Sequence, residues 1–113
     1  MTKFLALFMG PADPADRPAP PSEATVQKGM AAWGGWMQQH AAQIVDTGGP
    51  VGTTKMASRA GITDIRNAVA GYVIVEAPSH AAAAQMFEGH PHFAIFPGES
   101  VEVMECLPIP GAP

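Results

Sequence analysis

The sequence predicts an α+β protein with a ferredoxin-like βαββαβ fold. First, residues 4–9 and 71–76 form two almost entirely apolar runs, which are typical of strands buried on both faces of a sheet. Second, segments with helix signals separate the strands, so that the order is strand, helix, strand, strand, helix, strand. The first and third strands are central in this arrangement, and they are the two apolar runs. We therefore expect a four-stranded antiparallel sheet with two helices on one face.

The first helix is predicted from its N-terminal signals. Residues 10–21 contain five prolines and two aspartates, so this segment is expected to be a loop. Ser22 follows as a plausible N-cap, with Glu23 in the first turn. The helix is expected to run to about Val45, and the sequence Gly-Gly-Pro at 48–50 is expected to end the segment.

One face of this helix is marked by an apolar stripe with steps of three and four residues. The stripe consists of Val26, Met30, Trp33, Met37, His40 and Ile44. A histidine on such a stripe is either a core residue whose ring nitrogens form hydrogen bonds within the fold or a residue at the base of a pocket. Gly34 and Gly35 lie in the middle of the helix, where each costs about 0.5–1 kcal/mol relative to alanine. They indicate either a close approach of another group or a kink.

The remaining elements follow in order. Residues 51–56 are predicted to form the second strand, and residues 57–68 a polar connection, with a helical turn at 64–66 left open. Residues 71–76 are the clearest strand. A second helix is expected from Pro78-Ser79 through Phe87, with Gly89 as its stop.

The C-terminal part is expected to hold a loop at 92–98 and the last strand at 101–107. Residues 1–107 are therefore interpreted as a single domain. The Pro/Gly-rich tail, 108–113, is expected to be an arm or disordered.

The composition favours a homodimer. Charged residues make up only 14% of the 113 residues, where about 25% is usual, and hydrophobic residues make up 47%. So few charges cover the surface of a small domain poorly. The two helices cover one face of the predicted sheet, and a second copy packed sheet against sheet is the economical cover for the other.

The charge pattern argues against nucleic acid and membrane as partners. The net charge is −4 and the chain has no run of Lys or Arg, whereas both partners require a basic surface. Cys106 is the single cysteine, so no disulfide framework is possible within the chain. The apolar run at 4–9 is too short to span a bilayer. We expect a cytoplasmic protein.

The chain resembles the YCII-related (DGPF-type) family of small dimeric α+β-barrel proteins. The residues that carry the resemblance are the opening Lys-Phe-Leu-Ala-Leu-Phe-Met-Gly at 3–10, the strand at 71–77 followed by Ser79, the His90-Pro91-His92 sequence and the strand at 100–105. The Asp-Gly-Pro-Phe signature itself is absent, and Thr63-Asp64-Ile65-Arg66 stands in its place. The resemblance implies a ferredoxin-like protomer, a homodimer with packed sheets, and a cleft between helix and sheet with a histidine and a carboxylate as catalytic groups.

Histidines are the main candidates for chemistry, because imidazole is the natural acid or base at neutral pH. His40 and His90 are the predicted acid/base residues, with Asp64 or Asp46 as the orienting carboxylate. The alternatives are a structural His40 bonded within the fold, and aspartates that act as caps or turn residues.

His90 and His92 flank Pro91, which favours an extended backbone at His90. Two imidazoles in such a segment could share a metal, although no third ligand follows a known motif. The alternatives are a pocket role for one of them, or a helix-terminating turn in which His90 interacts with the C-terminal carbonyls of the second helix.

Ligand binding is predicted for Trp33, Met37, Tyr72 and His92. Two functions remain open. One is a cofactor-free acid/base enzyme of isomerase or lyase type, acting on a small apolar or aromatic compound in a helix–sheet cleft. The other is a non-catalytic ligand-binding or accessory homodimer with structural histidines. No cofactor is expected for either.

Overall fold

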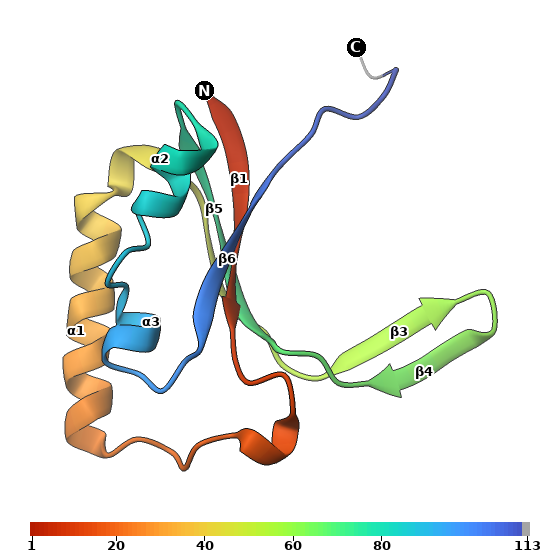
Figure 1. The fold of residues 1–113 in the computed structure, drawn as a ribbon, viewed down its shortest axis with the longest axis horizontal. Helices are drawn as coiled ribbons and strands as arrows, with labels where there is room; N and C mark the ends of the chain where they lie inside the picture. The colour runs from red at the N-terminus through yellow and green to blue at the C-terminus, as the bar shows by residue number, and fades with distance from the viewer. Residues whose placement is uncertain (112–113) are drawn as a thin grey trace.

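A computed structural model describes residues 1–111 (Figure 1). The strands and helices are β1 (Thr2–Met9), α1 (Glu23–Gln39), β2 (Ile44–Pro50), β3 (Thr54–Ser58), β4 (Gly61–Ile65), β5 (Val69–Ala77), α2 (His80–Gln85), α3 (Pro91–Ala94) and β6 (Ser100–Glu105). The predicted arm at 108–113 is described only as far as residue 111.

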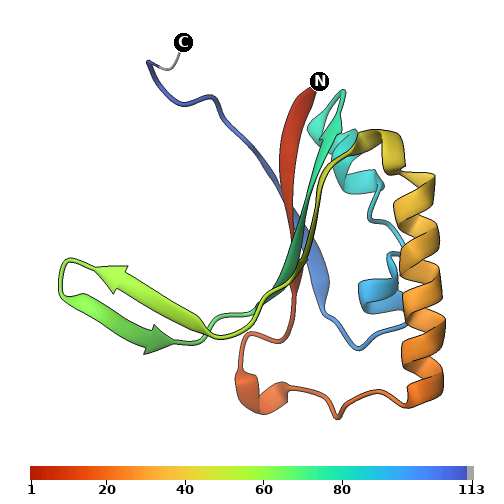
Figure 2. The same ribbon diagram turned by 180° about the vertical axis from the view of Figure 1, so that it is seen from behind.

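The main sheet has the strand order β2-β5-β1-β6, and all neighbouring strands are antiparallel. This is the ferredoxin-like order, with the two apolar strands β1 and β5 at the centre, as the sequence predicts. All three α-helices lie on one side of the sheet (Figures 1 and 2). The β3–β4 hairpin forms a separate two-stranded sheet, inserted between the second and third strands of the fold.

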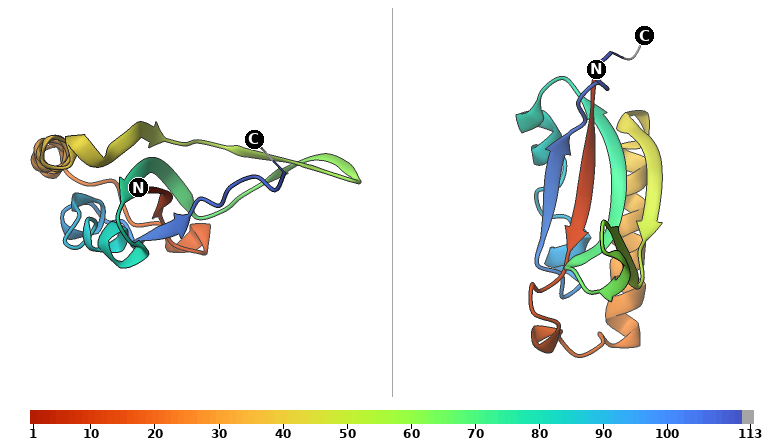
Figure 3. Two further views of the ribbon diagram at one scale, coloured as in Figure 1. Left: turned by 90° about the horizontal axis from the view of Figure 1, so that it is seen from above. Right: turned by 90° about the vertical axis from the view of Figure 1, so that its right-hand side faces the viewer.

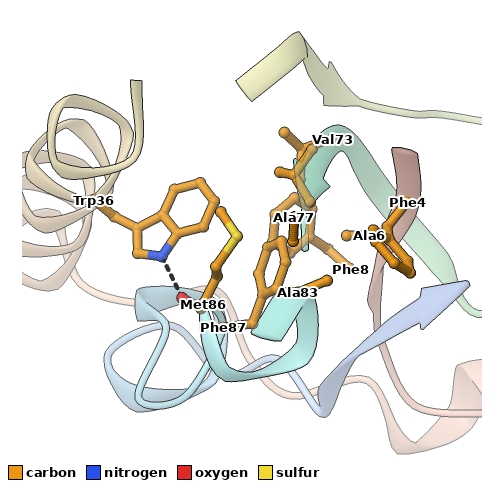
Figure 4. Packing of buried hydrophobic residues seen from close by; sticks show 10 residues of the cluster. Phe4, Ala6, Phe8, Trp36, Val73, Ala77, Ala83, Met86 and Phe87 are labelled. Atoms are coloured by element: carbon orange, nitrogen blue, oxygen red, sulfur yellow. Dashed lines mark hydrogen bonds between the residues drawn. The ribbon is translucent and has the colours of Figure 1, made fainter. Parts of the chain in front are cut away.

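The core lies between the sheet and the helices. Alternate residues of the central strands point into it, and helix side chains pack against them (Figure 4). The buried hydrophobic residues are Phe4, Ala6, Phe8, Trp36, Val73, Val75, Ala77, Ala83, Met86 and Phe87. The indole Nε1–H of Trp36 donates a 2.8 Å hydrogen bond to the carbonyl of Met86, which joins α1 to the end of α2.

The prediction that the first helix reaches Val45 is wrong. Ser22 caps α1 as expected, since its side chain accepts from the N–H of Thr25, but the helix ends at Gln39 and His40 is its C-cap. A short 3-10 turn follows, and β2 begins at Ile44, opposite Val75. Pairing with the central strand therefore overrides the helical spacing of the sequence.

The prediction of a second strand at 51–56 is also wrong, because the strand that pairs with β5 is Ile44–Pro50. Gly48 has a φ of +59°, and a methyl group built on it would overlap the carbonyl of Tyr72, so a glycine is needed within the strand. β2 lies at the edge of the sheet, where proline and irregular pairing are tolerated. The Gly-Gly-Pro sequence is thus part of an edge strand.

Three further local predictions are corrected. The sequence allows a helical turn at 64–66, but residues 64 and 65 are the end of β4 and residue 66 follows it, because residues 54–65 pair as a hairpin. The predicted loop at 92–98 includes most of α3, with Pro91 at the start of that helix. Ser79 caps the second helix as expected, but α2 ends at Gln85, before the predicted Phe87; Gly89, with a φ of +67°, follows as the predicted stop.

The face of the sheet opposite the helices is bare in the protomer. Leu5 of β1 lies between Ile74 of β5 and Met104 of β6 on this face, and all three are partly or well exposed. The hairpin and the segment after β6 both extend away from the helices on this side (Figures 1 and 3). No helix among residues 1–111 is long and apolar enough to cross a membrane.

Candidate functional site

A cavity of about 380 Å³ lies between α1, the β2–β5 edge of the sheet and the α3 region. Its walls are mainly aromatic and aliphatic. The lining residues are Phe8, Met30, Trp33, Trp36, Met37, Thr47, Gly49, Pro50, Ala70, Gly71, Tyr72, Val73, His92 and Phe96. This volume lies within the usual range for small-molecule sites. Among the described residues that line it, none is Asp, Glu, Lys or Arg, so the cavity favours a neutral ligand.

Phe96 forms part of the cavity wall because α1 has a notch at Gly29. A methyl group built on Gly29 would overlap the Phe96 ring. By contrast, a methyl group on Gly34 or Gly35 would meet nothing within 4 Å, so these glycines are not the close approach that the sequence suggested. The position of the Phe96 ring therefore depends on the absence of a side chain at residue 29.

His92 is held with a defined orientation. Its Nε2–H donates to the carbonyl of Met9 at 2.8 Å, and its own carbonyl accepts from the N–H of Gly98 at 2.9 Å. A methyl group on Gly98 would overlap the imidazole. The ring is therefore held between β1 and the segment that leads into β6.

The Met9 contact determines which nitrogen of His92 is available. Because a carbonyl can only accept, neutral His92 carries its proton on Nε2 and a lone pair on Nδ1. Nδ1 of His92 has no hydrogen-bond partner among the described residues, and this atom is not completely buried. His92 thus lines the cavity, and the lone pair on its Nδ1 accepts no hydrogen bond from the described residues.

His90 lies behind the aromatic wall and does not line the cavity. It is fully buried, and its Nδ1 accepts from the N–H of His92 at 3.0 Å, which caps α3. Its backbone is extended, as Pro91 predicts, but its side chain caps the following helix and does not bind the end of α2. Its ring centroid lies 4.6 Å from that of Trp33 and 4.8 Å from that of Trp36.

The electrostatics of His90 follow from this position. Its Nε2 is buried and has no hydrogen-bond partner among the described residues. Burial, and to a lesser degree the nearby His92 and His40, lower the pKa of His90 from 6.5 to about 4. His90 is therefore neutral at physiological pH, with its Nε2–H enclosed by aromatic rings.

The structure does not bring the predicted catalytic residues together at the cavity. His40 lies at the end of α1, against Trp36 with 4.9 Å between ring centroids, and its Nδ1 is 3.4 Å from Oε1 of Gln43. Asp64 lies on the exposed hairpin in an ion pair with Lys55 at 2.8 Å. The catalytic roles of His40, His90 and Asp64 stay predictions, and the described cavity contains no carboxylate.

Asp46 acts as a turn residue, which is the alternative that the sequence offers for it: its Oδ1 accepts from the N–H of Gly48 within β2.

Both members of the His90–His92 pair use a ring nitrogen in the hydrogen bonds described above. Among residues 1–111, no group of three or more His, Cys, Asp or Glu side chains is arranged to hold a metal ion.

The four predicted ligand-binding residues do share one site. Trp33, Met37, Tyr72 and His92 all line the cavity. Phe96 was missed, because the sequence places it in a loop where nothing indicates the contact with Gly29. No local signal marks this pairing, since it joins residues far apart in the chain.

Comparison with known proteins supports the fold. No family model matches the chain, and no curated protein matches its sequence. The chain is similar in structure to 5-chloro-2-hydroxyhydroquinone dehydrochlorinase from Burkholderia phenoliruptrix AC1100, solved in complex with 2,5-dihydroxybenzoquinone. The TM-score is 0.52 and the identity 20%, over 89% of each chain. At this identity the likeness shows the ferredoxin-like fold alone, and it supports the resemblance to YCII-related proteins only at that level.

Proposed function

We propose that this protein binds a small, neutral, hydroxylated ring compound in the cavity, with His92 as its polar anchor. The observation that carries the proposal is an apolar cavity with an oriented imidazole in its wall. Aromatic and thioether side chains favour a flat ring through dispersion and stacking. The Nδ1 lone pair selects a ligand that can donate a hydrogen bond.

The proposed chemistry is cofactor-free acid/base catalysis of isomerase or lyase type. A ligand O–H that hydrogen-bonds to Nδ1 can pass its proton to His92, which makes the ring an imidazolium. The Met9 carbonyl then accepts from a cationic donor, and this contact strengthens with the charge. The proton can return from Nδ1 to another atom of the ligand, so that His92 acts as base and then as acid.

The structural neighbour is consistent with this ligand class. That protein is named as a dehydrochlorinase and is bound to 2,5-dihydroxybenzoquinone, a ring compound with two hydroxyl groups. Because the hydroxyl groups of that compound are strongly acidic, the probe for this chain is hydroquinone, a neutral ring that keeps two O–H donors at pH 7.

A second candidate function is ligand binding without catalysis. The observation that favours it is the absence of a carboxylate from the described lining of the cavity, because catalytic histidines are commonly oriented by one. In this case His92 recognises the ligand and no bond changes.

The test compares His92→Gln with His80→Gln. Glutamine at 92 retains a donor for the Met9 carbonyl but removes the imidazole base. His80 is exposed, outside the cavity, and donates through Nε2 to the carbonyl of Val103, so its variant is the matched control. Binding of hydroquinone and of 1,4-dimethoxybenzene, which has no O–H donor, is measured by calorimetry in the absence of oxygen, and product formation from hydroxylated quinols by chromatography.

We expect hydroquinone to bind more tightly than 1,4-dimethoxybenzene, with a loss of about tenfold or more in His92→Gln and no change in His80→Gln. Turnover that His92→Gln abolishes supports the enzyme. Binding without turnover supports the second candidate. The absence of any preference for the hydroxylated probe, or equal binding by both variants, contradicts the role of His92.

We also propose that the protein is a homodimer that packs through the bare sheet face. The protomer exposes 7661 Å², whereas a compact monomer of 11.7 kDa exposes about 5,900 Å². The excess exceeds the roughly 800 Å² that each partner buries in a standard interface. Leu7→Glu on this face is expected to weaken association in sedimentation experiments, whereas Gln27→Glu on the exposed side of α1 is not. A wild-type chain that stays monomeric contradicts the proposal.

A further inference from the structure

The β3–β4 hairpin is the part of the protomer with the least support from the rest of the fold. It forms its own two-stranded sheet, and every residue from 55 to 66 is exposed. An isolated two-stranded hairpin is marginally stable in water. The radius of gyration is 15.8 Å, against about 13 Å for a compact domain of this length, in keeping with these projecting segments. The hairpin therefore lacks a packing partner within its own chain.

The two faces of the hairpin differ in chemistry. Cross-strand partners point to the same side, so Met56 and Thr63 share a face with Thr54 and Ile65. This face carries no charged residue, and we call it the uncharged hairpin face. The opposite face carries the Lys55–Asp64 ion pair, together with Ala57 and Ile62. Such a two-sided ribbon is typical of a strand pair with one face packed and one in water.

The net charge of the hairpin is opposite to that of the rest of the chain. Residues 54–65 contain two of the six cationic residues and one of the ten acidic residues. The hairpin therefore carries a charge of +1, and the remainder of the chain carries −5. A second copy of this chain accordingly offers a surface of complementary sign.

The hairpin also lies where a second copy would meet it. It extends from the sheet on the side of the bare face, away from the helices, as the segment after β6 does (Figures 1 and 2). A copy packed on the bare face would lie between these two projections. The bare sheet face and the hairpin thus form one continuous surface for a single partner.

We propose that the β3–β4 hairpin is an intersubunit arm whose uncharged face packs on a second copy of this chain. The inference rests on the proposed homodimer and adds to it the segment that reaches across. The arm gains the packing that it lacks in the single chain, and the opposite sign of its net charge favours the approach of the two copies.

The test compares Met56→Asp on the uncharged hairpin face with Ile62→Asp on the opposite face. Both place the same charge on the same exposed hairpin, where Met56 is 41% and Ile62 is 75% exposed in the protomer. Dissociation constants of the purified full chain are measured by analytical ultracentrifugation. Hydrogen exchange of the hairpin amides is followed by mass spectrometry as the protein concentration is raised through the dimerisation range.

We expect Met56→Asp to weaken the dimer about 100-fold or more, because a two-fold assembly carries the substitution twice. Ile62→Asp is expected to change the constant less than about threefold. The hairpin amides should become protected as the wild-type dimer forms, and Met56→Asp should remove this protection.

The outcomes separate this inference from the homodimer itself. If the wild type dimerises but its hairpin stays unprotected and Met56→Asp is neutral, the arm is refuted and the sheet-face dimer stands. Equal weakening by both substitutions refutes the assignment of the uncharged face. A chain that remains monomeric at all concentrations refutes both proposals.

Discussion

The neutral, buried His90 makes the stability of the fold depend on pH, and the effect can be measured by replacing that residue with asparagine. An asparagine side chain can still accept from the N–H of His92 as a helix cap, but it does not titrate. His90→Asn therefore removes the titration while it retains the local hydrogen bond.

The sign follows from the lowered pKa. His90 has a pKa of about 4 in the folded protein, against 6.5 for an unperturbed histidine. As pH falls below 6.5, the unfolded chain binds this proton first and the folded state loses relative stability. The contribution of His90 to the free energy of unfolding is therefore fully present above about pH 6.5, and it is lost progressively as the pH falls to about 4.

The two pKa values set the magnitude. Between pH 7 and pH 5 the loss from His90 alone is about 2 kcal/mol, and it reaches about 3 kcal/mol below pH 4. The window from pH 5 to pH 7 is the useful one, because most carboxylates titrate below it. The two proteins differ only at residue 90, so the difference between wild type and variant reports on His90.

The assay is urea unfolding at pH 7 and pH 5, at a fixed protein concentration. We expect His90→Asn to be less stable than the wild type at pH 7, because it loses ring packing against Trp33 and Trp36, but to lose about 2 kcal/mol less between the two pH values. If wild type and variant lose the same free energy within about 0.5 kcal/mol, His90 is not held neutral by burial and the reasoning fails.

Two further predictions concern α1. Gly29→Ala is expected to displace the Phe96 ring and to lower stability by about 1–3 kcal/mol despite the better helix propensity of alanine, while Gly34→Ala, which meets no neighbouring atom, should stabilise the protein by about 0.5–1 kcal/mol. Thermal and urea unfolding of the two variants provide the comparison, and a stabilised Gly29→Ala would show that the ring adapts without strain. Trp36→Phe removes the hydrogen bond to the Met86 carbonyl and is expected to cost about 1–3 kcal/mol, measured by urea unfolding. A change below about 0.5 kcal/mol would indicate that water replaces the indole N–H at that carbonyl.

Local signals determined the centre of the fold. The apolar runs became β1 and β5, and Ser22 and Ser79 cap their helices through contacts three residues away. These features depend on neighbours along the chain, so the sequence is enough to predict them. The ferredoxin-like order follows from the two central strands and the helices between them.

The tertiary structure decided the elements that depend on distant partners. The edge strand β2 is set by its pairing with β5, which ends α1 before His40 and draws a Gly-Gly-Pro sequence into a sheet. Helical periodicity cannot reveal this, because strand pairing satisfies backbone groups across the sheet.

The site shows the same division. The sequence predicted Trp33, Met37, Tyr72 and His92 as ligand-binding residues from their chemistry and the predicted elements, and all four line one cavity. It did not distinguish the roles of the two neighbouring histidines. His92 is oriented by the Met9 carbonyl, 83 positions away in the chain, while burial leaves His90 neutral behind the cavity wall. The sequence alone therefore predicts which residue types can bind a ligand. The tautomer of His92, the burial of His90 and the access of each ring to the cavity are set only when distant segments pack together.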